Sequence, residues 1–370
     1  MANETLHVIN NRSTSVRPKA DGDPFLVPQL VIFAVIITVT VVGNFFICWI
    51  ELKRKPRKSS GYFIINLAIS DLAVGLVSIP LDIVEQLSNG WPFLDFMCKV
   101  VYPLQTVLMA VSVTTLLCMS IERYRAVVTP FKSKLSGRFI VKVIISVWAT
   151  SILLVTPYTL VLTMKDGNCI EDWPSQDHVK IYTASVFAVL YLLPLTLISI
   201  CYTKIGVYLH KEVKRWKSMI KSIRRMRKMS NVRHTQNIKI IKAFVAAVLA
   251  FAICQLPTHV IWLWHDFGTG RSWKHLYDVL PFCHILTYLN SAIDPFIFGS
   301  LNARVLRKKF TSMFSCFKGR KWQRQNRGSG SRKVMFPQKP NTRRKGSGTR
   351  RNCLGPRCKR STSNTMESYV

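Results

Sequence analysis

The sequence is poor in acidic residues. Its 370 residues include 18 aspartates and glutamates against 52 lysines and arginines, a formal net charge of +34. Such an excess of basic residues often indicates nucleic-acid binding. Here the basic residues fall between long apolar stretches, so that interpretation is weak and we expect no nucleic-acid partner. The sequence also lacks a recognisable nucleophile–base pair and a glycine-rich phosphate loop, so we expect no enzyme and no cofactor.

Two further absences concern membrane insertion. Residues 1–24 contain no apolar run, so we expect no cleavable signal peptide and an uncleaved first span that acts as the insertion signal. No internal repeat is visible, which argues against the paired-repeat architecture of many transporters.

Long apolar stretches are abundant, because 49% of the residues are hydrophobic. Seven stretches are long enough to cross a hydrocarbon core of about 30 Å as helices. We therefore predict an all-α membrane protein, a seven-transmembrane helix bundle over residues 25–300. The predicted spans are Phe25–Ile50, Gly61–Glu85, Phe96–Val128, Phe139–Leu162, Ile181–Leu209, Ile238–Trp264 and Leu276–Ser300.

The distribution of charge predicts the orientation. Eight lysines and arginines lie on the side of the amino terminus and the other 44 on the opposite side. Because basic loops stay in the cytoplasm, we expect residues 1–24 to be an extracellular tail of a plasma-membrane protein. Twelve of the 18 acids lie on the same outer side, so the outer face is net negative.

The two ends carry short motifs. Asn3 and Asn11 begin glycosylation sequons in the outer tail. Residues 301–317 alternate apolar and basic residues, which predicts a short amphipathic eighth helix on the inner membrane surface, with Cys316 as a palmitoylation candidate. Residues 318–370 form a basic tail that we expect to be disordered and attracted to anionic lipid, ending at Ser368–Val370 in a match to a PDZ-domain ligand.

Two acids lie deep within predicted spans, away from the membrane surfaces, where charge is costly and points to function. Asp71 and Asp294 fall at comparable depths, and Ser112 and Asn290 could add neutral oxygens. Such a set of oxygens would suit a sodium ion; the alternative is a protonated acid pair that only holds helices together.

Cys98 and Cys169 are the cysteines assigned to outer ends or loops. They are candidates for a disulfide bond, and the alternative is two unrelated thiols.

These features, taken with the motifs in each span, resemble rhodopsin-like (class A) G-protein-coupled receptors. The motifs, in chain order, are Gly43-Asn44, Leu67-Ala68-x-x-Asp71, Glu122-Arg123-Tyr124, Trp148, Pro194 with Tyr202, Phe251-x-x-Cys254-x-x-Pro257 and Asp294-Pro295-x-x-Phe298. Within that family the chain looks most like the receptors of the neuropeptide Y, neuropeptide FF and RFamide kind. The residues of this closer likeness are Gln105, His259, Asp266, His284 and Trp91-Pro92-Phe93. The resemblance also favours the Cys98–Cys169 disulfide.

The resemblance implies an extracellular neuropeptide ligand. A net-negative mouth would steer a basic peptide, Asp266 could pair with a ligand arginine, and Gln105 suits a carboxamide terminus. We expect His259, His284 and Glu171 to contact the same ligand. The alternative for Asp266 is a solvated loop acid.

The resemblance also implies an inner switch that couples to a heterotrimeric G protein and to arrestin. Glu122 would hold Arg123 in the resting state, and Phe131 would enter a groove of the G protein. The other switch positions are Tyr124, Tyr202, Phe251, Gln255, Pro257, Asp294, Pro295 and Phe298.

Three positions depart from the family pattern. Gln255 replaces a tryptophan beneath the ligand pocket, and Phe298 replaces a tyrosine. Asn237 stands where an acid often reaches Arg123, so we predict raised basal activity.

The resemblance excludes near neighbours. Aminergic receptors need an acid where Gln105 stands, and opsins need a lysine where Tyr288 stands. Two alternatives stay open: the same receptor fold with a non-peptide or unrelated peptide ligand, and a seven-helix ion transporter that uses Asp71, Asp294 and the histidines.

Overall fold

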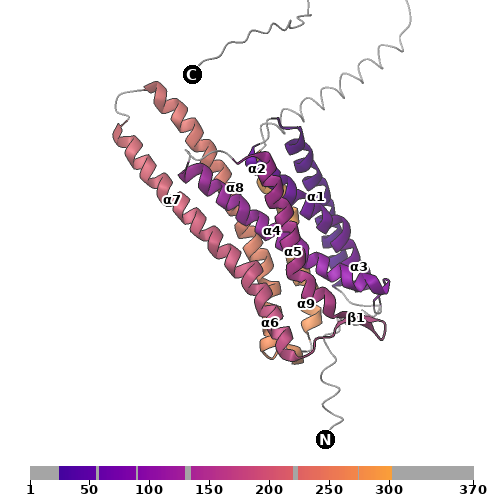
Figure 1. Ribbon diagram of the computed structural model, residues 1–370. Coiled ribbons are helices and arrows are strands. Elements are labelled where there is room, and N and C mark those ends of the chain that lie inside the picture. The colour runs from indigo at the N-terminus through magenta and orange to yellow at the C-terminus, as the bar shows by residue number, and fades with distance from the viewer. Residues whose placement is uncertain are drawn as a thin grey trace, which may run out of the picture. The chain divides into compact units, whose positions relative to one another are not determined.

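Seven helical rods form a bundle in the computed structural model (Figure 1), which describes residues 25–55, 58–88, 91–129, 135–219, 224–273 and 275–301. The rods are α1 (Leu26–Lys53); α2 (Ser59–Ala73), η1 (Val74–Ser78) and α3 (Ile79–Leu87); α4 (Asp95–Val128); α5 (Gly137–Val161); α6 (Gln176–Phe187), η2 (Ala188–Leu192) and α7 (Leu193–Met219); α8 (Arg224–Phe267); and α9 (Leu276–Leu301). The predicted seven-helix bundle is confirmed. The amphipathic helix predicted over 301–317 lies outside the described residues.

The rods have the length and surface of membrane spans. Within the described ranges, the first six rods are long and apolar enough to cross a bilayer. The seventh, α9, has 26 residues and is therefore about 39 Å long. Leu153 and Leu160 on α5 are 70% and 74% exposed. Such apolar side chains on the outside of a bundle belong in lipid.

The spans predicted from apolarity agree with the helices except where the helices leave the membrane. α7 continues ten residues beyond the predicted end at Leu209, and α8 begins fourteen residues before the predicted start at Ile238. Figure 1 shows these extensions of α7 and α8 reaching past the ends of their neighbours. Basic residues dominate them, so an apolarity criterion cannot detect them although the helices continue.

Two rods widen into π-helical turns where a proline follows. Pro80 removes the N–H that would bond the carbonyl of Leu76, which lies in η1, and Pro194 does the same to Leu190 in η2. A π turn bonds residues five apart and leaves room for the proline ring. The chain therefore continues as one rod through each of these prolines.

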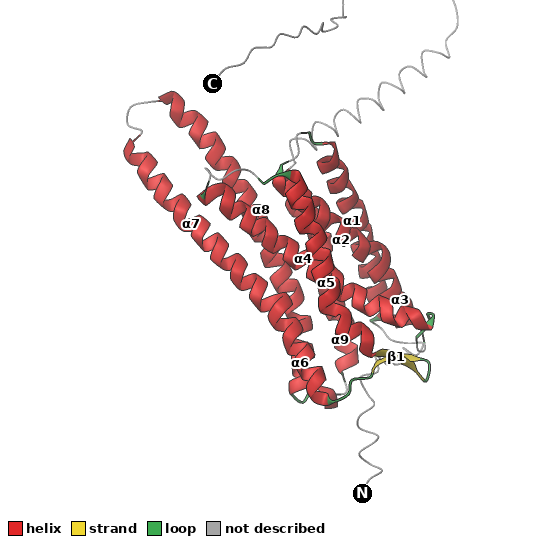
Figure 2. Cartoon of the chain, viewed as in Figure 1, coloured by secondary structure: helices red, strands yellow, loops and turns green. Residues whose placement is uncertain are grey.

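A β-hairpin covers the end of the bundle near the disulfide, and within the described residues it is the only sheet (Figure 2). β1 (Leu162–Lys165) pairs antiparallel with β2 (Asn168–Glu171) across Asp166 and Gly167, which have φ values of 49° and 72°. Asp-Gly favours this two-residue turn because glycine and, less readily, aspartate accept a positive φ. The predicted disulfide is present: Cys169 on β2 is bonded to Cys98 on α4.

Polar contacts between rods supplement the apolar core. Asn66 Nδ2 donates to Thr115 Oγ1 at 2.8 Å, and Trp148 Nε1 donates to Asn66 Oδ1 at 2.9 Å, so one buried side chain joins α2, α4 and α5. Asn44 Nδ2 on α1 donates to Ser291 O on α9 at 3.0 Å. That carbonyl is the one left without its helical donor by Pro295.

Candidate functional site

A cavity of about 250 Å³ runs from the hairpin toward the middle of the bundle. Glu171 of β2 lines one end, and Ser112 of α4 and Asn290 of α9 line the other. Ser112 follows Cys98 by 14 residues of helix, so it lies about 21 Å further along α4. Four of the five predicted ligand-binding residues line this cavity: Gln105, Glu171, His259 and His284.

The fifth, Asp266, does not line the cavity. It is 6% exposed, and its carboxylate accepts a hydrogen bond from Thr183 Oγ1 at 2.5 Å and faces His265 Nδ1 at 2.8 Å. These contacts join α8 to α6. The expected pairing of Asp266 with a ligand arginine stays a prediction.

Two buried polar atoms lie in the α8 wall of the cavity without hydrogen-bond partners among the described residues. Gln255 Oε1 and His259 Nε2 belong to side chains that are 4% and 7% exposed. The His259 ring packs against both Phe187 and Tyr191, with centroid distances of 5.6 Å and 5.0 Å. A buried polar atom without a partner is costly, so these atoms are suited to a polar ligand group.

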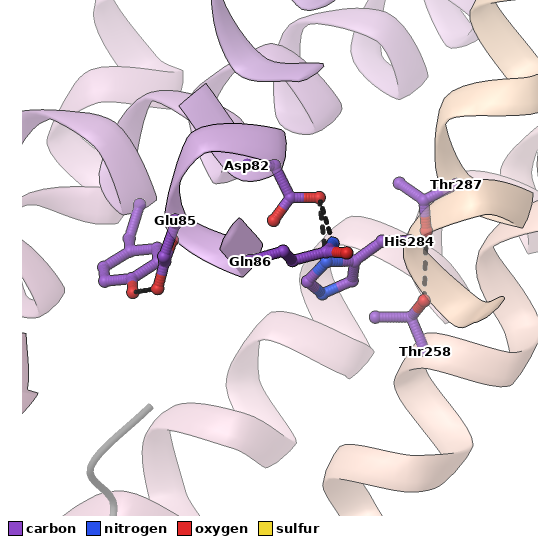
Figure 3. A network of polar contacts seen from close by, with 7 residues as sticks. Asp82, Glu85, Gln86, Thr258, His284 and Thr287 are labelled. Carbon is purple, nitrogen blue, oxygen red and sulfur yellow. Dashed lines mark hydrogen bonds and ion pairs between the residues drawn. The ribbon is translucent and has the colours of Figure 1, made fainter. Parts of the chain in front are cut away.

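The opposite wall holds a network of acids, aromatic rings and a histidine (Figure 3). Asp82 Oδ2 faces His284 Nδ1 at 3.3 Å and accepts from Gln86 Nε2 at 3.4 Å. Glu85, one turn further along α3, accepts a hydrogen bond from the Tyr102 hydroxyl. Asp82 and Glu85 are only 5% and 6% exposed. Both acids belong to the twelve that the sequence places on the outer face, and no local pattern indicates a role for them because their partners lie on α4 and α9.

The candidate sodium ligands come together beneath the cavity. Asp71 and Asp294 are 0% and 2% exposed and interact with each other across α2 and α9. Ser112 and Asn290 line the cavity floor beside them, and Ser70 Oγ lies 3.2 Å from Ser112 Oγ. Within the described residues no group of three or more histidine, cysteine or acidic side chains could hold a metal ion. A cation here would therefore depend on the two carboxylates and on neutral oxygens.

The predicted switch residues lie at the other end of α4. Arg123 Nε donates to Glu122 Oε2 at 2.6 Å. Among the described residues, Glu122 is the ion-pair partner of Arg123. The Arg123 guanidinium also lies 5.8 Å from the centre of the Phe244 ring, and Phe244 packs against Phe298 at 5.9 Å. The contact expected between Glu122 and Arg123 is present, and its role in holding the resting receptor stays a prediction.

The remaining switch positions are described only in part. Tyr202 on α7 is half-buried beside Ser120, and Tyr124 is half-buried at the end of α4. Phe251 lies fully buried beneath the cavity, and Pro257 is inside α8. The predicted sites Asn3, Asn11, Phe131, Cys316 and Ser368–Val370 lie outside the described residues.

Comparison with known proteins agrees with this geometry. Residues 43–298 match the family described as 7 transmembrane receptor (rhodopsin family). The chain belongs to this family. It is therefore a multi-pass membrane receptor and not an enzyme, as the motifs predicted.

Individual relatives show which receptors within this family the chain resembles. The receptor is 31% identical over 292 residues to neuropeptide FF receptor 2 of Rattus norvegicus, covering 73% of this chain and 68% of the relative. It is 34% identical over 298 residues to galanin receptor type 1 of the same species, covering 78% and 82%. It is 28% identical over 298 residues to the RYamide receptor of Tribolium castaneum, covering 76% and 78%. The predicted likeness to neuropeptide receptors is confirmed.

Proposed function

We propose that this receptor binds a basic, C-terminally amidated neuropeptide at its extracellular face and passes the signal to heterotrimeric G proteins. Its relatives are named for neuropeptide FF, galanin and RYamide. The observation that carries the proposal is the chemistry of the cavity. The residues that line it include Glu171 and no lysine or arginine, while Gln255 and His259 offer buried polar atoms without partners.

This chemistry favours an amide over a free carboxylate at the peptide terminus. A carboxamide is neutral, and its N–H groups can donate to Gln255 Oε1 while its oxygen accepts from the Gln105 or His259 side chain. A free carboxylate would bring a negative charge beside Glu171, with no lysine or arginine among the described lining residues to pair with it. The amidated terminus therefore enters the cavity.

The size of the cavity limits how much of the peptide enters. Its 250 Å³ lies just below the range of about 300–1000 Å³ that is usual for small-molecule pockets. The last one or two residues of a peptide fill such a volume, and the rest lies over the hairpin and the outer ends of the helices.

The remaining partners follow from the same proposal. Bound peptide favours the packing in which Arg123 leaves Glu122 and the inner face receives the G protein. The positive-inside distribution of lysine and arginine supports an extracellular amino terminus in the plasma membrane. Arrestin, anionic lipid at the basic tail and a PDZ-domain protein at Ser368–Val370 complete the proposed partners.

We also propose that sodium binds between Asp71 and Asp294 and stabilises the resting receptor. The support is the burial of the two carboxylates and their electrostatic interaction, with Ser112 and Asn290 lining the floor of the cavity. Sodium would supply the positive charge that two adjacent carboxylates otherwise lack.

The proposal is tested by calcium or cyclic-AMP signalling in cells that express the chain, with mock-transfected cells as control. The panel contains RFamide and RYamide peptides, their free acids and unrelated basic peptides. A response to amidated arginine-containing peptides supports the proposal. A response restricted to free acids or to non-peptide ligands, or silence across the panel with surface expression confirmed, contradicts it.

A further inference from the structure

The network around Asp82 and Glu85 has no role in the amide contacts just described, yet it borders the same cavity. Tyr102, His284 and Tyr288 line the cavity, and the Tyr102 hydroxyl and His284 Nδ1 face away from it toward Glu85 and Asp82. Seen from the cavity, the wall therefore consists of aromatic rings at the surface and two carboxylates in the layer behind them. His284 projects from α9 toward Asp82 on α3, as Figure 3 shows.

The charge of this wall is not balanced by a strong base. Among the described residues that line the cavity there is no lysine or arginine, and His284 is the basic side chain that they place in contact with Asp82. Two acids buried to this extent normally require a paired cation. His284 can balance the charge of at most one of these two acids, so the wall can accept a further cation.

A separate observation marks the same wall as a binding surface. Ser78 is 1% exposed and lines the cavity one helical turn before Asp82. Its Oγ has no hydrogen-bond partner among the described residues. It is an acceptor available to an N–H donor that approaches along the wall.

We propose that this wall, formed by Ser78, Tyr102 and Tyr288 in front of Asp82 and Glu85, is the subsite for a guanidinium group of the peptide ligand. A guanidinium is planar and weakly hydrated, so it stacks on tyrosine rings and donates to Ser78 Oγ while the two carboxylates attract it. An ammonium is more strongly hydrated and loses more on entering. This subsite and the Gln255–His259 wall would receive the arginine and the amide of one peptide terminus.

The proposal rests on the proposed peptide ligand but is tested without any peptide agonist. The two probes are L-argininamide, which carries a guanidinium and a carboxamide, and L-citrullinamide, which keeps the α-amine and the carboxamide but has a neutral urea in place of the guanidinium. The apparent affinity of each is obtained from the concentration dependence of the thermal unfolding midpoint of the purified full-length receptor. We expect argininamide to bind about 30-fold more tightly than citrullinamide.

Substitutions test which side chains cause the preference for argininamide. Asp82→Asn with Glu85→Gln keeps the size and hydrogen-bonding capacity of both side chains, and should reduce the preference to about threefold or less. Asp278→Asn removes an exposed outer acid that pairs with His275, and should retain it. Glu85→Gln alone should lower the preference severalfold, and it provides the test if the double variant fails to fold.

Several outcomes would overturn the proposal. They are equal affinity for the two amides, a preference that survives loss of both acids, and a preference lost in Asp266→Asn instead. The last result would assign the cation to Asp266, as the sequence predicted. Silence of the peptide panel together with a clear argininamide preference would refute the proposed function and leave this subsite standing.

Discussion

Replacing Gly43 by alanine is expected to force α1 away from α9. A Cβ at this position would lie 2.6 Å from both Cβ and Cγ of Pro295, about 0.8 Å inside the shortest ordinary contact of 3.4 Å. The proline ring cannot rotate aside, so the backbone must move. Movement would also stretch the 3.0 Å hydrogen bond from Asn44 to Ser291 O, the carbonyl that Pro295 leaves without a helical donor.

The expected cost is about 2–3 kcal/mol. Overpacking of this kind costs about 1–3 kcal/mol, and a hydrogen bond between membrane helices contributes about 0.6 kcal/mol. The thermal unfolding midpoint of the detergent-purified receptor should therefore fall by several degrees. Gly206→Ala on α7 is the matched control, because nothing lies within 4 Å of a Cβ there. It should be neutral, or stabilising by up to about 1 kcal/mol. A Gly43→Ala midpoint equal to or above that of Gly206→Ala would refute the reasoning.

Further predictions concern the hydrogen bonds between helices, the disulfide, the basal activity and the binding of sodium. Asn66→Ala should destabilise the receptor by about 1–2 kcal/mol. In thermal unfolding, the double variant with Trp148→Phe should lose less stability than the sum of the two single variants, because both remove the same hydrogen bond. A loss equal to that sum would contradict the shared contact. Serine at either disulfide cysteine should cost about 2–5 kcal/mol and reduce surface expression, with the double variant no worse than the single ones. Asn237→Glu should lower basal second-messenger signal toward that of mock-transfected cells; an unchanged basal signal would show that this position does not restrain the receptor. Sodium should raise the unfolding midpoint relative to an organic cation at equal ionic strength, and Asp71→Asn should abolish the difference.

Much of the fold was predictable from sequence because membrane spans have a strong one-dimensional signal. A run of twenty or more apolar residues is recognisable in the sequence without knowing which helix it packs against. The predicted spans therefore agree with the rods wherever the rods lie in lipid. The hairpin was missed although Lys165-Asp166-Gly167-Asn168 carries a turn signal. The two strands have only four residues each, so they do not stand out beside the long apolar runs, and their pairing depends on the Asp-Gly turn.

The candidate site was only partly predictable. Gln105, His259 and His284 were predicted to bind the ligand from the family resemblance, and all three line the cavity. The contact between Asp82 and His284 joins residues 202 positions apart and has no local pattern. The burial of Asp266 against Thr183 was equally invisible, because it depends on how α6 packs against α8.

The most direct measurement of the central claim is the potency ratio between an amidated peptide agonist and its free acid on the receptor and on Gln255→Leu. Each ratio compares two ligands on one receptor, so any general effect of the substitution on switching cancels. The account predicts that the amide is at least about 30-fold more potent on the unmodified receptor, and that the ratio falls severalfold in Gln255→Leu. Equal potency of amide and acid, or a ratio that the substitution leaves unchanged, would contradict an amidated terminus bound against Gln255.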